Sequence, residues 1–339
     1  RWGIAGKLAE ASPFGIDYPN NVVFATRLSG HLLHRFENAL WCRPGKHPFY
    51  SEHSQWIPQY LVEEVMRAHA VTLRGVEITF GRALLAFSQD AEGVRATVRD
   101  VESGAVDVIT SRYLIGADGS RSRVREAIGA TMNGVRGLSH NYNIVFRAPG
   151  LADAHALGPA IMYWLVNAEQ PCMVGPMDRG DKWFFMPTKV AAEGRLTDFE
   201  SAQLIARSIG IDREFEVLSS DEWTASRLIA DKYRDRRVFL AGDACHLHPP
   251  FGGYGMNMGV ADAVDLGWKI AATLAGWGGE ALLASYEPER RPVHEFVMDE
   301  AVANHSALSN HFLVPGLEAD DEAGVRLRAE AAEKIRTTK

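Results

Sequence analysis

One acidic residue in this sequence stands directly after a short apolar run, a position suited to binding a ligand. Residues 238–241 are apolar and predict a strand, and Gly242 and Asp243 follow them. Doubly wound sheets bind ligands at the carboxyl ends of their strands, where a carboxylate can accept hydrogen bonds from a sugar hydroxyl. Asp243 is therefore a candidate ligand-binding residue, and the alternative is that it only caps the next turn.

A glycine-rich loop comes next and leads into a helical pattern. Gly252, Gly253 and Gly255 carry no side chains, so the backbone can lie close to a flat or anionic ligand. The helix, expected to begin between residues 255 and 261, directs its first N–H groups toward the same place. The alternative is an ordinary helix start. The candidate ligand-binding residues of this segment are Gly242, Asp243, Gly253, Gly255, Met256 and Asn257.

A His-Pro-Pro turn joins the strand to this loop. Pro249 and Pro250 stiffen the turn and remove two backbone donors. His246 and His248 flank them, and a histidine can act as a base near neutral pH, although such a residue is more often a hydrogen-bonded structural one. Cys245 reads as a small, buried hydrophobic residue.

A second stretch, residues 110–129, has the pattern of a strand, an acidic turn and a helix. Asp118 follows the strand, and Arg125 lies one turn into the helix, where a cation can meet an anionic ligand. The alternative is that Asp118 caps the helix. Arg121 and Arg123 read as solvated charges.

Residues 237–274 and 110–129 resemble, in order and spacing, two flavin-binding motifs of the class A FAD-dependent monooxygenases, the phenol and hydroxybenzoate hydroxylase family. A third segment, residues 57–70, is similar to the family helix whose opening glutamine, here Gln59, faces the flavin. The resemblance implies FAD as the cofactor and NADPH or NADH as the co-substrate. It also implies a reaction that consumes O2 and adds one oxygen atom to a phenolic or other small aromatic substrate.

The resemblance also implies roles for the candidate residues. Asp243 would bind the ribityl chain of FAD, and the backbone of residues 253–257 would face the flavin pyrimidine. Asp118 and Arg125 would meet the FAD pyrophosphate or the nicotinamide cofactor. Pro250, the one residue assigned to catalysis, would lie beside the substrate phenol.

The implied fold class is α/β, with a doubly wound, glutathione-reductase-like FAD-binding domain and a β-rich substrate domain. We expect residues 1–137 to form the first part of the FAD-binding domain and residues 138–230 the substrate domain. Residues 231–339 would return to the FAD-binding domain and end in a helical tail, with Pro288 and Pro292 marking a turn in it.

Two pieces of the family pattern are missing from the sequence. The opening G-x-G-x-x-G turn that holds the FAD pyrophosphate is not found, so the first βαβ unit, about 30 residues or more, is expected to be absent. The thioredoxin-like C-terminal domain of many relatives is not found either. We therefore expect the chain alone to bind FAD weakly or not at all. A remnant or binding module without cofactor is one alternative, and a flavin halogenase, suggested by residues 56–58, is another.

Composition limits the other function classes. The 339 residues suggest about two domains, and the net charge of -7 with scattered lysine and arginine argues against nucleic acid as a partner. The three cysteines, Cys42, Cys172 and Cys245, form no C-x-x-C pair, which favours a reducing, cytoplasmic location and predicts no metal site. No apolar run reaches the roughly 18 residues of a membrane helix.

A group of aromatic residues in the expected substrate domain has two interpretations. Large aromatic side chains in strands usually belong to the core, but they can also line a pocket for a ring-shaped substrate. The residues of this group are Tyr163, Trp164, Trp183, Phe184 and Phe185.

Overall fold

The computed structural model describes residues 2–40, 48–50, 52–188, 190, 194–308 and 312–338. Cys42 lies outside this range. The chain forms two compact units. Unit 1 holds residues 1–77, 140–223 and 309–339, and unit 2 holds residues 78–139 and 224–308. These units divide the chain at other places than the expected domain boundaries, because residues 1–77 group with most of the expected substrate domain. The functional assignment of the three expected segments stays a prediction.

Unit 1 is built on a mixed sheet. Within it β10 pairs antiparallel with β7 and β9, β8 pairs antiparallel with β9, and β1 lies between β8 and β2. The elements are α1 (Ala5–Ala11), β1 (Val22–Ala25), β2 (Leu32–Phe36), α2 (Gln59–Ala70), η1 (Leu151–Asp153), β8 (Met162–Leu165), β9 (Cys172–Pro176), β10 (Lys182–Pro187), α4 (Asp198–Ile209) and α8 (Glu322–Thr337). Two strands, β7 (Met132–Arg147) and β11 (Glu216–Ala230), contribute residues to both units.

The core of unit 1 decides between the two interpretations of the aromatic group. Side chains alternate along a strand, so Trp183 and Phe185 of β10 are buried while Phe184 between them is half-buried. Tyr163 is buried with them, and Trp164 lies on the other face of β8. Tyr163, Trp183 and Phe185 therefore belong to the core, as the first interpretation predicts.

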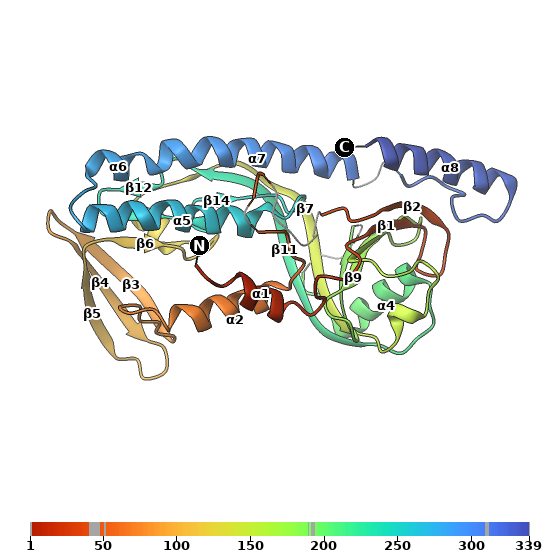
Figure 1. The fold of residues 1–339 in the computed structure, drawn as a ribbon, viewed down its shortest axis with the longest axis horizontal. Helices are drawn as coiled ribbons and strands as arrows, with labels where there is room; N and C mark the ends of the chain where they lie inside the picture. Colours follow the sequence, from red (N-terminus) through yellow and green to blue (C-terminus); the bar gives the residue numbers. More distant parts are fainter. Residues whose placement is uncertain are drawn as a thin grey trace. The chain divides into compact units, whose positions relative to one another are not determined.

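Unit 2 contains the two segments that carry the flavin-like motifs. A parallel pair, β6 and β13, is extended by β12, and β3, β4 and β5 form a separate antiparallel sheet. In Figure 1 the helices α5 and α7 run side by side along this unit. The elements are β3 (Arg82–Gln89), β4 (Val94–Asp100), β5 (Val106–Ser111), β6 (Leu114–Gly116), α3 (Arg123–Ala127), β12 (Arg234–Asp235), β13 (Val238–Leu240), η2 (Gly242–Ala244), β14 (His246–Leu247), α5 (Tyr254–Leu274), α6 (Glu280–Ala284) and α7 (Tyr286–Leu308).

Two expectations about unit 2 need correction. Helix α5 begins at Tyr254, one residue before the expected window, because Gly253 takes the left-handed conformation at the N-cap. The two prolines do not mark a turn within the tail, since α7 runs through both. Pro288 lies in the first turn, where its missing N–H costs nothing, and Pro292 lies inside the helix.

A helix that crosses a membrane needs about 20 residues of predominantly apolar character. None of the described helices combines the length and the apolar character that this requires.

Candidate functional site

The carboxyl ends of β6 and β13 meet at one edge of the parallel sheet. Leu240 is paired with Gly116, and the Ala241 N–H continues the ladder by donating to the Gly116 carbonyl at 3.0 Å. Residues 238–240 are fully buried, as the sequence predicts for this strand. Asp118 and Asp243 follow these two neighbouring strands, so the structure brings both acidic residues to the same edge.

Asp118 is not the N-cap of α3, which is Ser122, but it supports the start of that helix. One carboxylate oxygen accepts a hydrogen bond from the Val124 N–H at 3.1 Å, and the other accepts from the Ser122 hydroxyl. Ser122 in turn is the N-cap of α3 and accepts from the Arg125 N–H at 2.9 Å. Asp118 therefore organises the start of α3, and its contact with a cofactor stays a prediction.

Arg125 links the two motif segments to each other. Its side chain is buried, and its guanidinium donates to the carbonyl oxygens of Ala244 and Ser120, both at 3.0 Å. These bonds hold η2 against the loop that follows β6. Two of its donors are thus used within the protein, and a role in phosphate binding stays a prediction. Arg121 and Arg123 are exposed, in agreement with solvated charges.

Asp243 differs from Asp118 because its side chain has no hydrogen-bond partner in the described part of the chain. Its side chain is exposed, and no group among the described residues donates a hydrogen bond to its carboxylate. Partial loss of hydration raises the pKa of this carboxyl, and the nearby His246 opposes that effect. The capping alternative therefore fails for Asp243, and its carboxylate is free to accept hydrogen bonds from a ligand.

The glycine loop leaves the start of α5 open. Gly252 has φ of +120°, and a side-chain carbon there would lie 2.2 Å from the Tyr254 ring. Among the residues that the structure describes, no side chain caps the first N–H groups of α5, and no atom lies within 4 Å of the place where a Gly255 side chain would be. Met256 and Asn257 are exposed at the same helix start. These features suit an anionic or flat ligand.

Asn257 and Pro250 are also tied to this loop. The Asn257 amide donates to the Gly253 carbonyl at 3.0 Å, and the Gly253 N–H donates to the Pro250 carbonyl at 3.0 Å. The Pro250 carbonyl is therefore part of a tight turn, as expected of a stiff connection. Its catalytic role stays a prediction.

A buried carboxylate that the sequence analysis did not single out lies beneath this loop. Asp262 of α5 accepts hydrogen bonds from the Gly242 N–H at 3.0 Å, the His246 Nε2 at 2.6 Å, the Arg290 Nε at 2.8 Å and the His294 Nε2 at 2.9 Å. Burial alone would raise the pKa of Asp262, but the bonds from the two histidines outweigh it and hold the pKa well below its usual range.

A signal for Asp262 was present in the sequence. Leu266 and Ile270 follow it at intervals of four residues, and both are buried on the same face of α5. An acidic residue in line with core positions indicates a charge with partners inside the protein. What the sequence did not show is which residues those partners are, because Arg290 and His294 lie on α7.

The histidines and the cysteine beside Asp262 are structural in this arrangement. His246 and His294 are fully buried with their rings stacked 3.8 Å apart, and His248 is half-buried. Burial and the neighbouring His246 lower the pKa of His248 to about 3. Burial also raises the pKa of the Cys245 thiol, which donates to the Gly242 carbonyl at 3.4 Å. Cys245 is the buried small residue that the sequence predicts.

Gln59 belongs to unit 1. It is the first residue of α2, is exposed, and donates to the Glu63 carboxylate at 2.7 Å. The helix coincides with the expected segment, while a contact of Gln59 with flavin stays a prediction.

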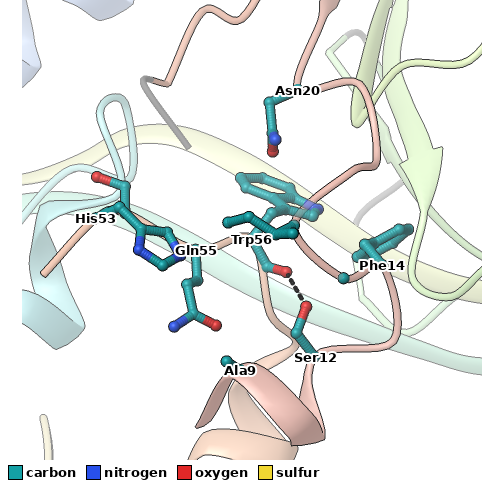
Figure 2. A pocket seen from close by; sticks show the side chains of 10 residues that line it. Ala9, Ser12, Phe14, Asn20, His53, Gln55 and Trp56 are labelled. Carbon is teal, nitrogen blue, oxygen red and sulfur yellow. Dashed lines mark hydrogen bonds between the residues drawn. The ribbon is translucent and has the colours of Figure 1, made fainter. Parts of the chain in front are cut away.

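Unit 1 also contains a pocket, shown in Figure 2. Among its lining residues, the Ser12 hydroxyl donates to the Trp56 carbonyl at 3.1 Å, and the Nε2 of His53 is buried without a partner among the described residues. Trp56 belongs to the segment that suggested a halogenase. The lining residues are Ala9, Ser12, Phe14, Gly15, Ile16, Asn20, His53, Ser54, Gln55 and Trp56.

Comparison with known proteins identifies the family. The family described as "FAD binding domain" matches residues 31–301. The chain belongs to this FAD-binding family. The match includes both motif segments and the whole of unit 2 as far as residue 301, and it confirms the resemblance to class A flavin monooxygenases.

Curated relatives of this chain are named as hydroxylases or monooxygenases. A putative polyketide hydroxylase of Streptomyces halstedii is 35% identical over 300 residues, which are 86% of this chain and 52% of the relative. Tetracenomycin B2 monooxygenase-dioxygenase of Streptomyces olivaceus is 37% identical over 278 residues, or 81% of this chain and 50% of the relative. The chain thus spans about half the length of the curated relatives it matches.

Solved structures support the α/β fold of this FAD-binding family member. RebC with bound 7-carboxy-K252c superposes with a TM-score of 0.85 at 33% identity, covering 99% of this chain and 62% of that one. Aklavinone-11 hydroxylase in complex with FAD and aklavinone gives a TM-score of 0.80 at 30% identity, covering 90% of this chain and 58% of that one. The predicted fold class is confirmed at this level.

Proposed function

We propose that this chain is the flavin-binding part of an aromatic hydroxylase. Its FAD site would lie at the edge where β6 and β13 end, between Asp243 and the start of α5. The observation that carries the proposal is the state of Asp243, an exposed carboxylate at the end of a buried strand to which no described residue donates a hydrogen bond. A helix start without a capping side chain lies in the same loop segment, and it offers N–H donors to a ligand.

The donor and acceptor set of this loop fits FAD. The Asp243 carboxylate can accept hydrogen bonds from ribityl hydroxyls, and the N–H groups at the start of α5 can face the flavin pyrimidine and stabilise negative charge there. Gly253 and Gly255 let the ring approach the backbone, and Met256 and Asn257 are exposed beside them. FAD, when bound, supplies the redox and oxygen chemistry, with NAD(P)H as the reductant and O2 as the oxygen source.

The role of the protein itself would be to orient the flavin and the substrate ring and to exclude water. The Asp118 and Arg125 interactions fix the loop after β6 and the turn η2, so the two sides of the site keep their shape. Pro250 stiffens the connection beside the glycine loop, where the substrate ring is proposed to lie. Relatives named for polyketide, tetracenomycin and dichlorophenol substrates support an aromatic ring as the substrate class.

Binding of FAD tests the site. Charge-assisted hydrogen bonds are worth about 1.5 to 3 kcal/mol each, and about 1.4 kcal/mol corresponds to a tenfold change in affinity. Asp243→Ala should therefore weaken FAD binding about tenfold to a hundredfold, while Asp243→Asn should lose less. Equilibrium dialysis at high FAD concentration measures this even where binding is weak. Asp212→Ala, which removes an exposed carboxylate from unit 1, is the control.

Labelled oxygen tests the reaction. In the full-length enzyme, supplied with NAD(P)H and an aromatic substrate, 18O2 should place one labelled atom in the product. Label from water instead, or NAD(P)H consumption that no aromatic compound changes, would count against a hydroxylase.

If Asp243→Ala bound FAD as tightly as the unchanged chain, the proposed position of the flavin would be wrong even if the reaction occurred.

A further inference from the structure

The pocket in unit 1 is lined by polar groups with unused hydrogen-bonding capacity. It lies between the end of α1, the loop of residues 12–20 and residues 53–56, and all of these segments belong to unit 1. None of the residues assigned to FAD or to catalysis lines it. The pocket is therefore a second place in the chain where a ligand can bind.

The loop that forms one wall of the pocket is fixed by contacts within unit 1. The Ser12 hydroxyl donates to the Trp56 carbonyl at 3.1 Å, and the Arg179 Nε donates to the Phe14 carbonyl at 2.8 Å. The Phe14 ring packs on Tyr18 with centroids 4.8 Å apart. Because the wall is in place before a ligand arrives, binding has a lower entropic cost.

The walls are aromatic and aliphatic, and the space between them is small. Phe14 is 2% exposed, and Trp56, Ile16 and Ala9 line the pocket with it. The pocket has a volume of about 100 Å³, and an engineered cavity of roughly 150 Å³ binds benzene. There is thus room for one ring and not for a fused polycycle. None of the lining residues is Asp, Glu, Lys or Arg, so a charged ligand would lose hydration without gaining an oppositely charged partner.

Two polar side chains complement these walls. The Nε2 of His53 is buried and has no hydrogen-bond partner among the described residues. Asn20 is 8% exposed, and its amide nitrogen donates to the Tyr18 carbonyl at 3.0 Å. Its amide oxygen accepts no hydrogen bond from the part of the chain that the structure describes, and Figure 2 shows the amide directed toward the Trp56 indole. Buried polar atoms without partners are rare in folded proteins, so these two atoms indicate a ligand with a polar group.

A hydroxyl on an aromatic ring satisfies both atoms at once. The Asn20 amide oxygen only accepts, so the ligand must donate to it. The His53 Nε2 donates when it carries the ring proton, so the ligand must then also accept. A hydroxyl is a donor and an acceptor in one atom, whereas a ring N–H group is a donor only.

We propose that this pocket binds a single uncharged aromatic ring that carries a hydroxyl group. The ring packs against Phe14 and Trp56, and the hydroxyl donates to Asn20 and accepts from His53. This site goes beyond the proposed function, because it requires neither FAD nor any residue of unit 2.

Three fluorinated probes of one ring each test this chemistry. The full chain without FAD is titrated with 4-fluorophenol, fluorobenzene and 4-fluorobenzoate, and 19F NMR measures each Kd. We expect 4-fluorophenol to bind at one site per chain. Fluorobenzene lacks the hydroxyl and should bind about threefold to tenfold more weakly, the usual effect of one neutral hydrogen bond. The charged 4-fluorobenzoate should bind most weakly.

Two variants, each with a matched control, locate the site. His53→Leu removes the buried nitrogen and keeps an apolar wall, so it should weaken 4-fluorophenol binding about threefold to tenfold and leave fluorobenzene binding unchanged. His69→Leu, at a half-buried histidine of α2, should change neither. Ala9→Phe directs a ring into the pocket from an exposed position of α1 and should abolish binding of both probes. Glu10→Phe, at the next exposed position of the same helix, should not.

Several outcomes would overturn the proposal. They are a lack of saturable 4-fluorophenol binding, equal affinity for the three probes, an equal loss of 4-fluorophenol and fluorobenzene in His53→Leu, and 4-fluorophenol binding that Ala9→Phe does not reduce. Circular dichroism shows whether each variant is folded, and Ala9→Leu fills the same space with a smaller side chain if Ala9→Phe is not. Asp243→Ala should leave 4-fluorophenol binding unchanged, so this result and the test of the flavin site are independent of each other.

Discussion

Asp262 offers the sharpest test of how unit 2 is held together. Its carboxylate is fully buried and receives four hydrogen bonds, one from the Gly242 backbone, one from Arg290 and two from His246 and His294. In Asp262→Asn the amide NH2 replaces one acceptor oxygen, yet every group around it is a donor. The amide NH2 must therefore face another hydrogen-bond donor, and the Arg290 guanidinium loses its negatively charged partner.

The burial of Asp262 sets how strongly Asp262→Asn destabilises the protein. Removing one partner of a buried ion pair usually costs about 3 to 5 kcal/mol, because an uncompensated charge stays in the protein. Asp262→Asn should therefore lower the free energy of unfolding by about 3 to 5 kcal/mol. Denaturant unfolding measures this as a lower midpoint at unchanged slope.

The chain provides a matched control for the same chemical change. Asp299 pairs with Arg227 at 2.6 Å, but its side chain is 68% exposed. Exposed pairs contribute about 0 to 1 kcal/mol, so Asp299→Asn should change the unfolding free energy by no more than that. If Asp262→Asn and Asp299→Asn had equal effects, the buried carboxylate would not carry the charge that we assign to it.

Three further outcomes are expected. His248 has a pKa of about 3 in the folded chain, against about 6.5 in the unfolded chain, so the unfolded state binds more protons as the pH falls. As the pH falls from 8 to 5, this group should therefore lower the unfolding free energy by up to about 2 kcal/mol. His248→Gln should remove that part of the pH dependence. Gly252→Ala, which places a carbon 2.2 Å from the Tyr254 ring at φ of +120°, should destabilise the chain by at least about 1 kcal/mol, whereas Gly255→Ala, at an open helical position, should not lower the thermal midpoint. Thr197→Ala breaks the capping box of α4 and should lower the unfolding free energy by about 0.5 to 2 kcal/mol, with Thr72→Ala beyond the end of α2 as an unaffected comparison.

Local patterns predicted the elements that carry the candidate site. The apolar run before Gly242 is a buried strand, and residues 59–70 are a helix with the expected bounds. The parallel pairing of β6 with β13 could be expected only through the family resemblance, because their residues are more than a hundred positions apart. Periodicity describes each element by itself, and it contains no information about which elements become neighbours.

The roles of charged residues were harder to predict for the same reason. Arg125 was expected to face a ligand, but its donors reach the Ala244 carbonyl on the other motif segment. Asp118 and Asp243 occupy similar places after two strands, yet the first accepts a hydrogen bond from the first turn of α3, and the second has no hydrogen-bond partner among the described residues. The difference lies in the next segment of the chain. Ser122 and α3 come directly after Asp118, whereas a tight turn and β14 come after Asp243.

This difference explains how one turn can be rigid and still serve a ligand. The backbone of η2 is held from two sides, by the Arg125 bond to Ala244 and by the Asp262 bond to the Gly242 N–H. Gly259 brings α5 so close to Gly242 that a side-chain carbon on it would lie 3.4 Å from the Gly242 Cα. All of these contacts use backbone atoms of the turn and leave the Asp243 side chain free. A carboxylate on a backbone that is already fixed, and that has no partner among the described residues, binds a ligand at a reduced entropic cost, because only its side chain remains to be ordered.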